Sequence, residues 1–298
     1  MARIKAGDLH LEHDAHGDPS GEPLLLIMGL GAQMTRWSQS FVDQLAARGF
    51  RVIRFDNRDV GLSDRLDHVG PPDMAAIFGA VSRGEAPPVA YDLSHMAGDA
   101  VALLDALGIA SAHIVGASMG GMIAQLVAAD HPARTLSLTS IMSTTGHPDL
   151  PRATPEAVAR LGAPAPDPRE DLEAYVAHSI VSARVMGSPA YPVPEAELRE
   201  QAISTVERAY YPVGFQRQYA AILASPERRS KLAGVTAPAV VIHGKADPLV
   251  PVEGGRDTAT AIPGAELVEI EGMGHDIPVP LYGAIIDAIV RVAQRART

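Results

Sequence analysis

The chain has 298 residues, a formal net charge of -10 at pH 7 and no cysteine. Without cysteine it has no disulfide bond, no thiolate nucleophile and no cysteine ligand for a metal. The excess of acidic residues argues against nucleic acid or an anionic membrane surface as a partner, because both would repel the protein. The length allows one large α/β domain or a domain with an insertion.

Residues 1–8 lack the apolar run of a signal peptide. No later stretch approaches the roughly 20 consecutive apolar residues that are needed to span a bilayer. We therefore expect a cytoplasmic protein that does not contact a membrane. The sequence makes no prediction of the oligomeric state.

Most of the chain alternates between short apolar runs and helical patterns. Continuous apolar runs are typical of parallel strands that are buried on both faces. Strands are expected at 23–28, 50–55, 112–115, 135–142, 238–243 and 265–270, after a hairpin at 3–15 on the edge of the sheet. Helices are expected between them, including 74–81, 252–261 and 281–294. This alternation predicts the α/β class, with helices flanking a mostly parallel sheet.

Three histidines in the expected hairpin, His10, His13 and His16, are spaced three residues apart. That spacing places neighbouring side chains on opposite faces of a strand, so they cannot converge on one ion. We expect solvated histidines here rather than a metal site.

The alternation stops between residues 145 and 225. Ten prolines separate short helical patterns in this stretch, and no strand is indicated. We predict a helical cap over 145–225, inserted into a catalytic core made of 1–144 and 226–298. Five of the seven tyrosines lie in the cap, where they either line a pocket for a largely apolar substrate or pack the cap against the core: Tyr175, Tyr191, Tyr210, Tyr211 and Tyr219.

The candidate nucleophile is Ser118, in the sequence Val-Gly-Ala-Ser-Met-Gly-Gly at 115–121. An apolar run precedes this segment and a helical pattern follows it, which is the context that supports a Gly-x-Ser-x-Gly nucleophile elbow. Gly116 and Gly120 lack a Cβ and would let the strand and the helix pack closely around the serine. The hydroxyl would then project from the carboxyl edge of the sheet, at the amino end of a helix.

A serine hydroxyl needs a base to take its proton and a carboxylate to orient that base. In this type of site the acid and then the histidine follow the serine along the chain. Asp247 lies just past one expected strand and His275 lies in a glycine-rich loop past the next. Both loops leave the carboxyl ends of strands, where ligands of open α/β sheets bind. We predict Ser118, Asp247 and His275 as the catalytic residues.

The developing oxyanion needs two backbone N–H donors. Met119, directly after the nucleophile, would supply one. Leu30, in the turn Met28-Gly29-Leu30-Gly31 that follows an early strand, would supply the other.

Over essentially its whole length the chain resembles the α/β-hydrolase superfamily, in the branch with a helical cap after the sixth strand. The resemblance rests on the turn at Gly29, the loop 56–63, the elbow, and the regions of Asp247 and His275. It implies the α/β-hydrolase fold, with a mostly parallel eight-stranded sheet flanked by helices. Many members have His-Gly at the oxyanion turn, whereas Met28-Gly29 is similar to the aclacinomycin methylesterase family of polyketide ester hydrolases. We expect Met28 and Gly29 to line the floor of the substrate pocket.

The predicted function is hydrolysis of carboxylic esters through an acyl-enzyme on Ser118, with a small, largely apolar ester as substrate and neither cofactor nor metal. Dehalogenases and epoxide hydrolases of this fold use an aspartate nucleophile, so Ser118 argues against both classes. Proline iminopeptidases have a different elbow sequence, which argues against that class as well. Lactonases, carbon-carbon bond hydrolases and perhydrolases share the triad and stay open as alternatives. A receptor that keeps the fold and binds a ligand without turnover is an alternative from another class.

Overall fold

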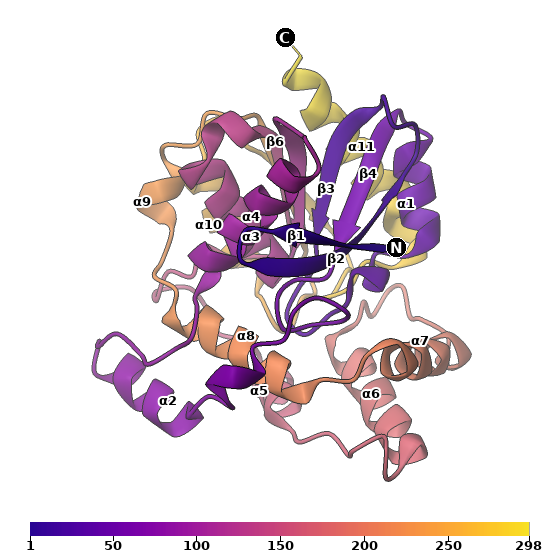
Figure 1. Ribbon diagram of the computed structural model, residues 1–298, viewed down its shortest axis with the longest axis vertical. Coiled ribbons are helices and arrows are strands. Elements are labelled where there is room, and N and C mark those ends of the chain that lie inside the picture. The colour runs from indigo at the N-terminus through magenta and orange to yellow at the C-terminus, as the bar shows by residue number, and fades with distance from the viewer. Residues whose placement is uncertain (298) are drawn as a thin grey trace.

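One sheet of eight strands organises the molecule in the computed structural model, which describes residues 1–297 (Figure 1). The strand order is β1-β2-β4-β3-β5-β6-β7-β8, and β2 pairs antiparallel with both β1 and β4 while the remaining pairs are parallel. This confirms the predicted mostly parallel sheet. The strands are β1 (Ala2–Ala6), β2 (Leu9–His16), β3 (Glu22–Ile27), β4 (Phe50–Phe55), β5 (Ala112–Ala117), β6 (Thr135–Ile141), β7 (Ala239–Gly244) and β8 (Glu266–Ile270).

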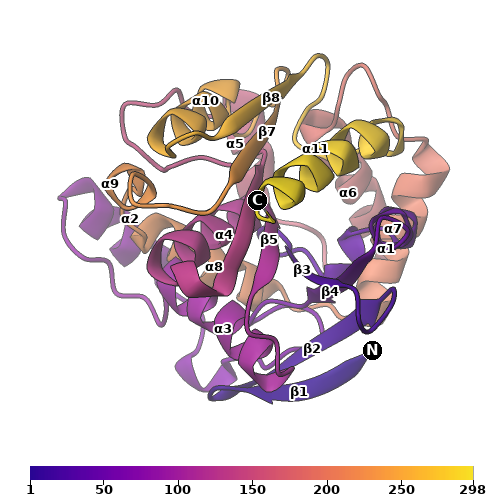
Figure 2. The same cartoon turned by 90° about the horizontal axis from the view of Figure 1, so that it is seen from above.

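Helices cover both faces of this sheet, as the view from above shows (Figure 2). One face packs against α3 (Leu93–Ala106), α4 (Met119–Asp130), α9 (Arg229–Leu232) and α10 (Val252–Ala261). The other packs against α1 (Gln39–Ala46) and α11 (Tyr282–Arg295). The central strands are buried from both sides, which explains why they consist of uninterrupted apolar runs.

Two helices begin where a side-chain oxygen accepts one of the free N–H groups of the first turn. The Ser38 hydroxyl accepts the N–H of Phe41 at the start of α1, and the Asp92 carboxylate accepts the N–H of His95 at the start of α3. Short 3-10 turns lie at Met34–Arg36, Asp67–Val69, Pro132–Arg134 and Val279–Leu281.

Four helices follow β6 and precede β7: α5 (Pro155–Gly162), α6 (Leu172–Met186), α7 (Glu195–Arg208) and α8 (Pro212–Ala224). They lie below the sheet in Figure 1, and α2 (Met74–Ser82), from an earlier loop, packs beside α8. Helices α6 and α7 share a small apolar core of their own. We call residues 145–225 the inserted segment; their treatment as a separate domain stays a prediction.

Several tyrosines of the inserted segment pack within it or against its neighbours. The rings of Tyr175 and Tyr210 meet edge to face with centroids 5.8 Å apart, and Tyr219 meets Phe78 of α2 in the same way at 6.4 Å. Of the two roles that the sequence left open for these tyrosines, the contacts favour packing.

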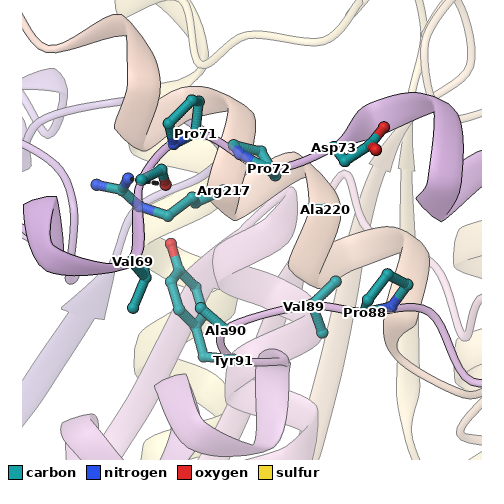
Figure 3. Close-up of a pocket in the computed structure, with 11 residues that line it drawn as sticks. Val69, Pro71, Pro72, Asp73, Pro88, Val89, Ala90, Tyr91, Arg217 and Ala220 are labelled. Carbon is teal, nitrogen blue, oxygen red and sulfur yellow. Dashed lines mark hydrogen bonds between the residues drawn. The ribbon is translucent and has the colours of Figure 1, made fainter.

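A buried ion pair joins the inserted segment to the core. The guanidinium of Arg217, on α8, donates to both carboxylate oxygens of Asp59, with distances of 2.8 Å from Nε and 2.7 Å from Nη2. The side chains are 3% and 0% exposed. Tyr91 Oη also donates to Asp59. Arg217 Nη1 donates to the carbonyl of Gly70 at 2.8 Å, and the side chains of Arg217 and Tyr91 lie close together in Figure 3. Every polar atom of the Asp59 carboxylate is thereby satisfied inside the protein.

Replacing Arg217 with methionine is expected to lower the free energy of unfolding by about 3–5 kcal/mol, because the carboxylate of Asp59 stays buried without its counter-ion. Urea unfolding followed by circular dichroism measures the loss. Arg199→Met is the matched control, since Arg199 pairs with Glu173 at side-chain exposures of 44% and 69%, and solvent screens such an exposed pair so that it contributes little to stability. Adding Asp59→Asn to Arg217→Met removes the stranded charge and is expected to recover part of the loss. Equal losses for the two arginine variants would contradict this account.

No helix within residues 1–297 is long and apolar enough to cross a membrane.

Candidate active site

Ser118 lies in the sharp turn between β5 and α4, with backbone angles φ 56° and ψ -122°. A positive φ is strained for a residue with a Cβ and persists only where the surroundings hold it. Two glycines make room for the turn: a Cβ on Gly116 would lie 2.0 Å from the carbonyl oxygen of Gly120, and one on Gly120 would lie 2.1 Å from that of Ile27. Strand and helix can therefore approach closely only with glycine at both positions, as the sequence predicts.

The structure brings the three predicted catalytic residues together at the carboxyl edge of the sheet. Ser118 Oγ lies 2.9 Å from His275 Nε2, and His275 Nδ1 lies 2.7 Å from Asp247 Oδ2. The Asp247 side chain is 0% exposed and that of His275 is 10% exposed. A proton on Nδ1 donates to the carboxylate and leaves Nε2 free to accept the serine proton, which is the arrangement that general-base catalysis requires.

The carboxylate of Asp247 is held by its own loop. Its Oδ1 accepts the N–H groups of Leu249 and Val250 at 2.9 and 2.8 Å. Burial raises the pKa of Asp247, but the positive charge of protonated His275 and hydrogen bonds from His243, His275 and Val250 outweigh burial and bring the pKa to about 2. Asp247 is consequently ionised at neutral pH and can stabilise a protonated His275.

Sequence reasoning missed His243, the residue at the end of β7. Its side chain is fully buried, and Nε2 lies 2.8 Å from the carbonyl oxygen of Val250 and 3.5 Å from Asp247 Oδ2. Gly255 makes room for the ring, because a Cβ there would lie 2.4 Å from His243 Nδ1. The signal in the sequence was the position of His243, four residues before the predicted acid.

The predicted oxyanion turn lies directly against the elbow: a Cβ on Gly29 would be 3.1 Å from the Cβ of Ser118. Within residues 1–297 no acceptor takes the N–H of Leu30. Met119 occupies the first position of α4, where the helix offers no acceptor for its N–H. Two donors beside the nucleophile are thus left without an internal partner. The Met28 side chain is buried in the core, and contact of Met28 or Gly29 with substrate stays a prediction.

Gln218, on α8, braces the oxyanion turn and was also missed from the sequence. Its Oε1 accepts the N–H of Gly31 at 2.8 Å, and its Nε2 donates to the carbonyl of Arg58 at 2.7 Å. The side chain is fully buried. A glutamine in the middle of a helix carries no local signal for this role, because the contact joins positions 187 residues apart.

The predicted solvent exposure of the hairpin histidines is correct for His10 and wrong for His13. His10 is exposed as expected, but His13 is only 9% exposed, and the expectation that it is solvated was wrong. The physical reason is that β2 lies between β1 and β4 rather than at the edge. The described residues contain no group of three or more histidine or acidic side chains placed to hold a metal.

A second serine, histidine and carboxylate group lies elsewhere in the same sheet. Ser137 Oγ is 2.8 Å from His113 Nδ1, and His113 Nε2 is 3.4 Å from Glu22. Burial lowers the pKa of His113, although Glu22 partly offsets this. Ser137 and His113 are buried within regular strands, so this serine has neither the strained turn nor the access of Ser118. Ser137 therefore provides an internal control for experiments on Ser118.

The pocket in Figure 3, of about 140 Å³, is lined by the loops 69–73 and 88–91 and by Arg217 and Ala220 of α8. None of the three catalytic candidates lines it. It belongs to the contact between the core loops and α8.

Comparison with known proteins supports the fold. Residues 22–279 match the model of the alpha/beta hydrolase fold family. Rhodomycin D methylesterase DnrP of Streptomyces peucetius is 31% identical over 96% of this chain and 95% of its own. Among solved structures, a meta-cleavage product hydrolase from Pseudomonas fluorescens aligns with TM-score 0.77 and 18% identity over 99% of this chain and 98% of its own. The enol-lactonase of Burkholderia xenovorans aligns with TM-score 0.71 and 22% identity, over 98% of this chain and 100% of its own. The chain therefore belongs to the alpha/beta hydrolase fold family.

Proposed function

We propose that this protein is a serine hydrolase that cleaves a carboxylic ester, with a methyl ester of a largely apolar acid as the preferred class of substrate. The observation that carries the proposal is the hydrogen-bonded series from Ser118 through His275 to buried, ionised Asp247. The methylesterase relative supports the choice of an ester among the bonds that such a triad can cleave. The apolar, only partly buried side chain of Leu30 in the oxyanion turn supports an apolar substrate.

The proposed reaction has two halves. Ser118 Oγ attacks the ester carbonyl carbon while its proton passes to His275 Nε2, and the N–H groups of Leu30 and Met119 bind the oxyanion. His275 then returns the proton to the departing alkoxide, which leaves as the alcohol. In the second half water attacks the acyl carbon while its proton passes to His275 Nε2. The bond between the acyl carbon and Ser118 Oγ then breaks, His275 returns the proton to Oγ, and the acid is released. Every step uses groups of the chain and water, and no cofactor or metal takes part.

A fluorophosphonate tests this proposal directly, because it bonds to an activated serine without requiring the natural substrate. We expect one adduct per chain by intact mass, located at Ser118 by peptide mapping and absent from His275→Ala. Ser137→Ala removes a serine whose hydroxyl is hydrogen-bonded to the ring of another histidine, His113, and this control should be labelled as fast as wild type. No adduct in a folded protein would overturn the proposal and favour the receptor alternative. Turnover of a panel of methyl esters, lactones and diketones then identifies the bond that is cleaved.

A further inference from the structure

Two residues at and just after the end of α6, Met186 and Ser188, make hydrogen bonds to His275 and to the residues on either side of it. The N–H of His275 donates to the carbonyl of Met186 at 2.7 Å. The N–H of Gly274 donates to Ser188 Oγ at 2.9 Å, and the Ser188 hydroxyl in turn donates to Asp276 Oδ1. The residue before His275 and the residue after it are therefore joined through a single oxygen that belongs to the inserted segment.

The segment after α6 and the loop before His275 are packed too closely to move past one another. A Cβ on Gly274 would lie 2.3 Å from the carbonyl oxygen of Gly187. Two residues earlier, Gly272 has a positive φ of 66°, and a Cβ there would lie 2.3 Å from the Cβ of Ala190. The N–H of Ala190 donates back to the carbonyl of Gly272 at 3.3 Å. Movement at the end of α6 must therefore move the loop that carries His275.

Ser188 is suited to this position because a hydroxyl both donates and accepts. Its one proton goes to the carboxylate of Asp276 and a lone pair takes the N–H of Gly274, so both neighbours of His275 are satisfied at once. The Ser188 side chain is buried, and water has little access to replace it if the hydroxyl is removed. The buried N–H of Gly274 would then remain unpaired beside the catalytic base.

We propose that Ser188 is a positioning residue for His275, and that it makes the alignment of the general base dependent on the end of α6. The inference rests on the proposed function. His275 must meet Ser118 and Asp247 at the same time, and a misplacement of about 1 Å in such a group can cost about 100-fold in rate. Ser188 acts on the reaction through the loop of His275 and does not itself touch the reacting atoms.

The test compares Ser188→Ala with Ser182→Ala. Ser182 lies within α6, six residues before Ser188, and its hydroxyl donates to the carbonyl of His178 at 2.9 Å, so each variant loses one hydroxyl from this part of the chain. With p-nitrophenyl acetate as the probe, we expect Ser188→Ala to lower kcat about 10- to 100-fold with KM unchanged, and Ser182→Ala to match wild type. Thermal unfolding of both variants shows that they are folded.

A second readout separates positioning from general loosening of the structure. The proton shared by His275 Nδ1 and Asp247 gives a far-downfield ¹H NMR signal, assigned by its absence in His275→Gln. In Ser188→Ala this signal should move or broaden, whereas in Ser182→Ala it should stay. Unchanged kcat in folded Ser188→Ala, or a lower kcat with an unchanged signal, would overturn the proposal.

If Ser188→Ala does not fold, Ser188→Cys takes its place, because it keeps the volume and loses the strong acceptor. The NMR signal needs no substrate and therefore tests the positioning even if esters are not cleaved. Absence of turnover and labelling in wild type would overturn the proposed function alone.

Discussion

Replacing Ser118 with alanine is expected to lower kcat by about 10⁶-fold, the scale found when the nucleophile of such a triad is removed. Folding should be retained, because the hydroxyl makes no cap hydrogen bond to α4 and its partner in the structure is His275. Alanine has the same Cβ as serine, so the cost of the positive φ at this position is unchanged. The measurement is steady-state hydrolysis of a methyl ester, together with thermal unfolding of both proteins.

Ser137→Ala provides the matched comparison for this variant. It also removes a serine that is hydrogen-bonded to a histidine in the same sheet, at 2.8 Å, and it is expected to keep the kcat of wild type. Comparable activity of Ser118→Ala and wild type would refute the assignment of the nucleophile. Equal losses in the two variants would point to a structural cause in the sheet instead.

Changing Asp247 to asparagine is expected to lower kcat by about 10⁴-fold. The asparagine amide can donate to His275 Nδ1, which would place the imidazole proton on Nε2, where it cannot accept the proton of Ser118. The variant also lacks the negative charge that stabilises protonated His275. Asp167→Asn is the control: Asp167 has its pKa lowered to about 2 as well, by hydrogen bonds from Arg169, but it is not bonded to the triad.

Asp247→Asn is also expected to change how the free energy of unfolding depends on pH. The pKa of Asp247 is about 2 in the folded protein and 3.8 without the fold, so the ionised carboxylate contributes about 2 kcal/mol to the free energy of unfolding. This contribution is present above pH 3.8 and is lost as the pH falls through about 2. The difference in stability between wild type and Asp247→Asn, measured by urea unfolding, should therefore shrink across this interval. A difference that stays constant would contradict the lowered pKa.

The strands and the catalytic candidates could be predicted because their signals are local. The runs of β3 and β5 are apolar over consecutive residues, and Ser118, Asp247 and His275 each follow an expected strand within a few positions. Because the strands are parallel, their carboxyl ends lie at the same edge of the sheet, and the residues that follow them come together at that edge.

The supporting residues could not be predicted because their roles depend on how distant segments meet. Gln218 and Ser188 lie in helical patterns or turns that look ordinary in sequence, and their contacts cross 187 and 86 positions. The burial of His13 likewise depends on which strand pairs with β2, which the hairpin pattern does not encode.

The contacts of the inserted segment with both catalytic loops limit how new specificities can arise on this scaffold. Gln218 braces the turn of Leu30, while Met186 and Ser188 hold the loop of His275. A chimera that receives the corresponding helices of a relative would exchange the residues that support both of these loops at once. Recombination is therefore productive only when the incoming helices restore both attachments, and divergence by point substitution at other positions of these helices is the easier evolutionary route.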